Sequence, residues 1–201
     1  MRIIGLTGGI ACGKSNISRV LAQQGAHIVD GDVLSRQLTA PGGAALPAIR
    51  AQFGAEVFLP DGSLNRRSLG QRIFSDDTAR FALDDIMQPL LLEMIRDEIS
   101  AARKKGAAVC VLDMPLLYEK GLDGLCERVW CAWLPRETQL ERLIARDGFS
   151  LQEAENRIDS QMPTDEKAAR ADVVIDTSGT FAETEERVIT LYAQETGSAP
   201  C

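Results

Sequence analysis

Five short apolar runs, separated by longer stretches of helical periodicity, recur along this chain. They fall at about residues 2–7, 27–31, 107–112, 129–134 and 173–176. The runs at 107–112 and 129–134 are continuously apolar, as expected for strands that are covered on both faces. Buried strands that alternate with helical segments are typical of βαβ units. The pattern therefore predicts an α/β fold with a five-stranded parallel sheet flanked by helices.

A long insertion separates the second apolar run from the third. Residues 36–105 contain the turn-forming segments Pro41-Gly42-Gly43 and Pro60-Asp61-Gly62, and then long helical patterns. An insertion of this length is too large for a simple crossover between strands. It predicts a helical lobe.

A second insertion, residues 136–170, follows the fourth run and is rich in arginine. Ser150 and Glu153 have the spacing of a capping box that begins a helix inside it. A second capping box, Thr180 with Glu183, precedes a final helix at about 181–195. The remaining stretches, 1–35, 106–135 and 171–201, make up the predicted nucleotide-binding core.

The strongest motif lies directly behind the first run, where residues 8–15 read Gly8-Gly9-Ile10-Ala11-Cys12-Gly13-Lys14-Ser15. This string matches G-x-x-x-x-G-K-[ST], the phosphate-binding loop (P-loop) of nucleoside triphosphatases. Behind it, Ile17, Val20 and Leu21 have the spacing of an amphipathic helix that ends near Gly25. Strand, glycine loop and helix form the context that the motif requires. The alternative is a glycine-rich turn that opens a Rossmann-like helix.

In such a loop, backbone N–H groups and the positive end of the helix converge on a polyphosphate. We expect Lys14 to act on the β- and γ-phosphates of ATP and the Ser15 hydroxyl to ligate Mg²⁺. Lys14 should face the ligand rather than the core. The residues predicted to hold the nucleotide here are Gly8, Gly9, Ala11, Cys12, Gly13, Lys14, Ser15 and Asn16.

Acidic side chains stand where the second and third strands are predicted to end. Asp32 follows the second run and could accept a proton from an acceptor hydroxyl or hold Mg²⁺ through water. Asp30 and Asp32 could instead cap the next helix. Asp113 ends the third run in the manner of a Walker B strand, and Glu119 follows nearby.

The arginines of residues 136–170 suit a lid that closes over ATP, because guanidinium groups bind phosphate oxygens and closure excludes water. Arg142 and Arg146 are the leading candidates, since they lie four residues apart on one helix face. The alternative is that these arginines are solvated charges, paired in part with Glu137, Glu141 and Glu153. A core with a helical acceptor lobe and a lid favours a small-molecule kinase.

Composition and charge argue against several other classes of protein. The net charge is −7 and the pI is near 4.9, so no broad basic surface supports nucleic-acid binding. No apolar run is long enough to span a membrane, and no secretory signal is recognisable at the N-terminus. The one histidine, His27, excludes a Ser-His-Asp triad. Five cysteines, of which Cys126 and Cys131 are the only close pair, favour reduced thiols in the cytoplasm over a zinc site.

An ordered set of motifs along nearly the whole chain resembles dephospho-coenzyme A kinase, a family of P-loop kinases. The set comprises Leu6-Thr7-Gly8-Gly9-Ile10, Asp30-Gly31-Asp32, Arg66-Arg67 with Ile73-Phe74, Pro115-Leu116-Leu117 with Glu119, Thr138-Gln139-Leu140 with Arg142 and Arg146-Asp147, and Ala171-Asp172-Val173-Val174-Ile175-Asp176. The chain departs from the family pattern at Asn16, at Gln88 and at Thr177, where members commonly have Thr, His and Asn.

The resemblance implies a P-loop nucleotide kinase fold and transfer of the ATP γ-phosphoryl group to the ribose 3′-hydroxyl of dephospho-coenzyme A, the last step of coenzyme A synthesis. It implies a core, an acceptor lobe at 36–105 and a lid at 136–170, with Asp32 as general base. The catalytic residues predicted are Asp32, Lys14 and Arg142, with Arg146 also on the nucleotide and with Ser15 and Asp32 on Mg²⁺. No nucleic-acid or membrane partner is expected, and a monomer is favoured. The alternatives are another small-molecule or nucleoside monophosphate kinase, or a regulatory module that binds nucleotide without turnover.

Overall fold

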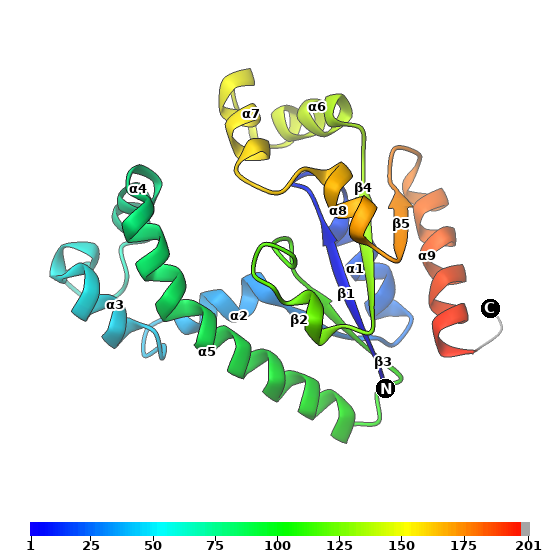
Figure 1. Cartoon of the computed structure of the whole chain (residues 1–201), viewed down its shortest axis with the longest axis horizontal. Coiled ribbons are helices and arrows are strands. Elements are labelled where there is room, and N and C mark those ends of the chain that lie inside the picture. The colour runs from blue at the N-terminus through cyan, green and yellow to red at the C-terminus, as the bar shows by residue number, and fades with distance from the viewer. Residues whose placement is uncertain (198–201) are drawn as a thin grey trace. The chain divides into compact units, whose positions relative to one another are not determined.

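The computed structural model describes residues 1–197 and contains a five-stranded parallel sheet in the order β2-β3-β1-β4-β5 (Figure 1). Its strands are β1 (Arg2–Gly8), β2 (His27–Asp30), β3 (Val109–Asp113), β4 (Arg128–Trp133) and β5 (Val173–Asp176). The predicted α/β fold is confirmed, and every apolar run forms a strand. The largest difference between predicted and observed strand bounds is at β3, which begins later than predicted and includes Asp113 as its last residue.

The chain divides into two compact units, which are described separately. The first consists of the residues up to Asp30 and those from Ala101 onward, and the second is Gly31–Ser100. The second unit begins and ends slightly earlier than the lobe predicted at 36–105. Helix α2 (Gly31–Leu38) falls within this second unit.

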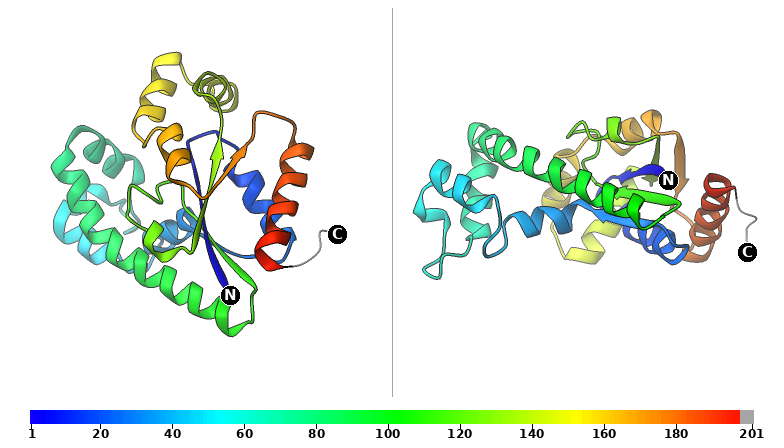
Figure 2. Two further views of the ribbon diagram at one scale, coloured as in Figure 1. Left: turned by 45° about the vertical axis from the view of Figure 1, so that its right-hand side comes forward. Right: turned by 90° about the horizontal axis from the view of Figure 1, so that it is seen from below.

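In the first unit, helices cover both faces of the sheet. Helices α1 (Lys14–Gln23) and α9 (Phe181–Thr196) pack side by side on one face (Figure 2). The core on that face includes Ile4, Leu6, Ile17, Leu21, Val109, Val111, Trp130, Ala132, Ile175 and Val188. Thr7 points to the opposite face because side chains alternate along a strand. The segment after β3, with the short helix η2 (Asp123–Leu125), and helix α8 (Thr164–Arg170) pack on that opposite side.

Between β4 and α8 lie α6 (Arg136–Asp147) and α7 (Leu151–Asp159). Helix α7 begins with the predicted capping box of Ser150 and Glu153, and α9 begins with that of Thr180 and Glu183. Both predictions are confirmed. Of the five cysteines, Cys201 lies outside the described residues. Within residues 1–197, no helix combines the length and apolar character needed to cross a membrane.

The second unit is helical and has a core of its own. It contains α2, α3 (Leu46–Phe53), the short helix η1 (Ala55–Val57), α4 (Arg66–Ser75) and most of α5 (Asp77–Lys104). Its buried members are Leu38, Ala45, Ile49, Phe53, Val57, Leu69 and Ala79. A core of its own is what a separate compact unit at residues 31–100 requires.

Candidate active site

The phosphate loop joins β1 to α1 and turns through backbone conformations that few residues adopt. Gly13 caps the N-terminus of α1 with a φ of 75°, and Ala11 has a φ of 62°. Helix α1 has no side-chain cap and no acidic residue in its first turn, so its positive end is left for an anion. Ser15 lies in this first turn with its side chain exposed. The predicted loop residues therefore form a helix N-terminus that is suited to a polyphosphate.

Two side chains from distant segments fix the orientation of this loop. Gln139 Nε2 donates to the carbonyl of Ile10 at 2.6 Å, and Thr177 Oγ1 donates to the carbonyl of Cys12 at 2.9 Å. Gln139 and Thr177 are only 2% and 5% exposed. In a trans peptide the carbonyl and the N–H point in opposite directions, so the N–H that follows each carbonyl points away from these buried partners. Carbonyls bonded on one side and N–H groups turned to the other create a backbone concavity for phosphate.

Gly9 leaves the space that this arrangement requires. A Cβ atom at Gly9 would collide with Thr164 Oγ1 and with Gln139 Nε2. Both side chains are buried, and Thr164 Oγ1 donates to Gln139 Oε1 at 3.4 Å. Any larger residue at position 9 would therefore displace the loop from its supports.

Lys14 forms an ion pair with Asp113, the last residue of β3. Their side chains are 17% and 5% exposed. Strand β3 lies next to β1, with Asp113 level with Leu6. The structure thus joins Lys14 to a carboxylate that sequence analysis named as a candidate but left out of the predicted site.

Asp32 belongs to the second unit, where it lies in the first turn of α2 and lines a cavity of about 400 Å³. Arg36 and Arg66 line the same cavity, and Arg66 Nη2 donates to Thr39 Oγ1 at 2.8 Å. The apolar part of the lining is formed by Leu64, Leu69, Ile73, Leu83 and Met87. A carboxylate, two guanidinium groups and an apolar wall suit a ligand with a hydroxyl group, negative charge and non-polar parts.

The five arginines of residues 136–170 all have partners within the protein. Arg142 Nη2 donates to the carbonyl of Thr177 at 2.9 Å, and Arg146 forms two hydrogen bonds of 2.8 Å with Asp147. These bonds raise the pKa of Arg146 and lower the pKa of Asp147. The other partners are Asp159 for Arg136, the Phe149 ring for Arg157 and the Tyr118 ring for Arg170. Of the glutamates that sequence analysis considered, Glu153 interacts electrostatically with Arg157, which lowers the pKa of Glu153 further after its bonds to Ser150 have lowered it.

Arg142 therefore lies beside the segment that supports the loop, whereas Arg146 is more open to solvent, with 57% of its side chain exposed. A small apolar cluster brings the loop and the helices together. Ile10 and Ala11 pack against Leu143, Ala154 and Ile158 of α6 and α7. Residues 136–159 thus contact the phosphate loop directly.

The cysteines described here are free thiols. Burial raises the pKa of Cys12, and it raises the pKa of Cys126 and of Cys131 to about 12. They are protonated at neutral pH and fill space in the core. Within residues 1–197, no group of three or more His, Cys, Asp or Glu is placed to hold a metal ion. A metal ion bound here would therefore need ligands from elsewhere, as Mg²⁺ does when it is carried by nucleotide phosphates.

Comparison with known proteins gives a consistent result. A family model described as CoaE, dephospho-CoA kinase, matches residues 2–183. A dephospho-CoA kinase from Geobacter sulfurreducens is 44% identical over 194 residues, covering 96% of this chain and 98% of the relative. The crystal structure of TT1252 from Thermus thermophilus superposes with a TM-score of 0.84 at 31% identity, covering 96% of this chain and 97% of that one. A dephospho-CoA kinase from Campylobacter jejuni shares the fold, with a TM-score of 0.74 at 24% identity and 98% of each chain covered.

Proposed function

The chain belongs to the dephospho-CoA kinase family, and we propose that its phosphate loop holds ATP while Asp32 acts on the acceptor hydroxyl. It catalyses the ATP-dependent phosphorylation of dephospho-CoA in coenzyme A biosynthesis. The observation that carries our assignment of roles is the uncapped N-terminus of α1 behind a loop whose carbonyls are bonded to buried side chains. Kinases that act on nucleoside monophosphates or polyols, considered from the sequence, are disfavoured by membership of this family.

On the nucleotide side, the loop N–H groups and the end of α1 bind the phosphates, and Lys14 stabilises charge on the transferred phosphoryl group. To do so, its ammonium must exchange part of its pairing with Asp113 for phosphate oxygens. Arg142 and Arg146 are the two lid arginines that we propose for nucleotide binding. Arg142 is already anchored beside the loop through Thr177.

Mg²⁺ fits the chemistry of the donors that we propose for it, which are the exposed Ser15 hydroxyl and the Asp113 carboxylate of the first unit and the Asp32 carboxylate of the second. Oxygen ligands from one or two side chains, completed by phosphate oxygens and water, are typical of Mg²⁺ in kinases. When bound, the ion neutralises charge on the β- and γ-phosphates. Ser15 and Asp32 are the ligands that we propose, with Asp113 as an addition from the structure.

On the acceptor side, we assign the cavity of the second unit to dephospho-CoA, with its ribose 3′-hydroxyl directed to Asp32. Arg36 and Arg66 supply positive charge for the diphosphate of the acceptor, and the apolar wall accommodates its less polar parts. A cytoplasmic location and a monomeric state complete the proposal. The free thiols of Cys12, Cys110 and Cys131 support the first, because disulfides are rare in that compartment.

Asp32→Asn tests the assignment, because it keeps the shape of the side chain and removes its basicity and charge. If Asp32 accepts the acceptor proton, kcat should fall about 10²-fold while the affinity for ATP changes less than about threefold. The measurement is kcat for ADP release with dephospho-CoA over a range of Mg²⁺ concentrations. Asp97→Asn, the same change at an exposed position of α5, is the matched control. Full recovery of Asp32→Asn at high Mg²⁺ would show that Asp32 is mainly a metal ligand.

A further inference from the structure

Lys167, on helix α8, is a lysine whose side chain is completely buried. It lies three residues after Thr164, and both side chains project from the one face of α8 that packs on the sheet. Moving an ammonium group out of water is costly unless charged and polar partners replace the water. The positions of those partners therefore indicate what the lysine does.

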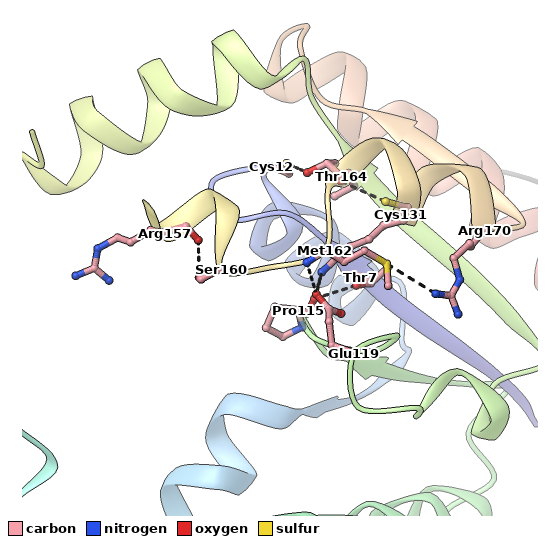
Figure 3. A network of polar contacts seen from close by, with 12 residues as sticks. Thr7, Cys12, Pro115, Glu119, Cys131, Arg157, Ser160, Met162, Thr164 and Arg170 are labelled. Atoms are coloured by element: carbon pink, nitrogen blue, oxygen red, sulfur yellow. Dashed lines mark hydrogen bonds and ion pairs between the residues drawn. The ribbon is translucent and has the colours of Figure 1, made fainter. Parts of the chain in front are cut away.

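The partners of Lys167 come from the segment that follows β3. Its Nζ donates to the carbonyl of Pro115 at 2.6 Å and forms an ion pair with Glu119 Oε1 at 2.8 Å. The same Pro115 carbonyl accepts a hydrogen bond from Thr7 Oγ1 at 3.1 Å, and Glu119 Oε1 accepts one from the Met162 N–H at 3.0 Å. Figure 3 shows Thr7, Pro115, Glu119 and Met162 converging at this point. Lys167 is thus bonded to two groups, each of which is bonded to a further segment.

These contacts join α8 to two parts of the proposed active site, the phosphate loop and the turn that follows β3. Thr7 directly precedes the phosphate loop, and Pro115 lies two residues beyond Asp113, the partner of Lys14. The Met114 N–H, between them, donates to the carbonyl of Leu6 at 2.9 Å. Lys167 therefore holds the turn after β3 against α8, while Thr7 and the Met114 N–H hold the same turn against the end of β1. Lys167 does so from within the protein and is closed to solvent.

Stability alone does not explain this ion pair, in which the Lys167 side chain is completely buried while the Glu119 side chain is 22% exposed. Replacing both partners of a buried pair by neutral groups of similar size is often neutral or stabilising. Because water reaches Glu119, the pair contributes less to stability than a fully buried pair would. A benefit of keeping the pair must then be sought in the geometry that it imposes. Its contacts hold the turn that follows Asp113, and small displacements of catalytic groups reduce rates strongly.

We propose that Lys167 is a positioning residue for phosphoryl transfer: through Pro115 and Glu119 it holds the turn after β3, and with it the Asp113–Lys14 pair, in the geometry that the reaction requires. The proposal rests on the roles assigned above to Lys14 and Asp113. It differs from a purely structural role in what it predicts for the folded enzyme. A structural role affects the fraction of folded protein, whereas a positioning role lowers the turnover of protein that is fully folded.

Three variants separate these roles. Lys167→Met keeps the length of the side chain and removes its charge, which leaves Glu119 without its cation. Lys167→Met/Glu119→Gln also removes the carboxylate, while the amide oxygen at position 119 can still accept the Met162 N–H. Lys105→Met makes the same change at an exposed position beyond α5 and is the control. Each is assayed for kcat and for both KM values at a temperature well below its own unfolding temperature.

We expect Lys167→Met to unfold at a lower temperature than wild type, because the Pro115 carbonyl and the partly exposed Glu119 carboxylate both lose their donor. The double variant should recover the part of that loss that comes from Glu119. In the double variant kcat should stay at least about tenfold below wild type, while KM for dephospho-CoA changes less than about threefold. The control should match wild type in both measurements. If Lys167→Met does not fold, the double variant alone decides the matter.

A double variant that regains both its unfolding temperature and its kcat would overturn the proposal and assign Lys167 to stability alone. A rise in KM for dephospho-CoA without a fall in kcat would also overturn it, since no contact described for Lys167 reaches the acceptor cavity. The wild-type rate in the same assay tests the proposed function separately. If wild type released no ADP in response to dephospho-CoA, the proposed function would fail, whatever the variants do.

Discussion

Replacing Lys14 by methionine should impair both catalysis and folding, and Asp113 allows the two effects to be separated. The catalytic loss follows from removing the cation that acts on the transferred phosphoryl group, and should be at least about 10²-fold in kcat/KM. The folding loss follows from the ion pair. Once Lys14 is gone, Asp113 keeps a carboxylate that is only 5% exposed and has lost its cation.

The size of the folding loss can be worked from that burial. Breaking a fully buried pair by removing one partner costs about 3–5 kcal/mol. The Lys14 side chain is 17% exposed, so water can reach the carboxylate that is left, and we expect a smaller cost of about 2 kcal/mol. For a protein of this size, that corresponds to a fall of about 4–8 °C in Tm.

The assay combines thermal unfolding, followed by circular dichroism, with coupled ADP release for Lys14→Met, Asp113→Asn and the double variant. The double variant has no carboxylate at position 113, so it should regain most of the lost Tm but none of the lost activity. Lys105→Met, at an exposed position, should leave both quantities unchanged. If Lys14→Met unfolded at the wild-type temperature, the ion pair would contribute nothing to folding. If the double variant regained activity, Lys14 would not be acting on phosphate.

Two further predictions concern the supports of the loop and the lid. Thr177→Val removes the hydroxyl that bonds the Cys12 carbonyl and keeps the shape of the side chain, so KM for ATP should rise about tenfold while KM for dephospho-CoA stays unchanged. Thr177→Ser keeps a hydroxyl and should restore the wild-type KM for ATP. A non-hydrolysable ATP analogue should slow amide exchange, measured by mass spectrometry, at about residues 144–161 more than in α8, because α8 is already packed on the sheet. Equal slowing in both segments would argue against a lid limited to residues 144–161.

The strands and the phosphate loop could be predicted because their signals are local. A buried strand needs a short apolar run, and the P-loop needs particular residues at fixed spacing in one stretch of chain. Lys167 could not be found in this way. It follows Asp165 and Glu166 in a short helix that looks like a solvated surface. The burial of Lys167 depends on its contact with Glu119, which lies in a turn far away in sequence.

The same reasoning applies to the supports of the loop. Gln139 and Thr177 are ordinary polar residues in their own segments, and nothing near them indicates that they would bond to the carbonyls of Ile10 and Cys12. Asp113 was visible as the end of an apolar run, but its pairing with Lys14 depends on β1 and β3 being neighbours in the sheet. Periodicity and motifs describe local stretches of sequence, so they do not predict which side chains from distant segments come into contact at the site.

The positions of these contacts bear on how residues 136–170 would move if they act as the lid that we propose. At one end, α6 is attached to the core through Gln139 and Arg142, which bond to the loop and to Thr177. At the other end, Met162 and Lys167 are attached to Glu119. The stretch between them, from the end of α6 through α7, meets the phosphate loop through apolar contacts, which allow sliding more readily than directed hydrogen bonds do. If residues 136–170 close over ATP as we propose, closure of this stretch alone would keep the supports that orient the loop N–H groups, whereas movement of the whole segment would break them.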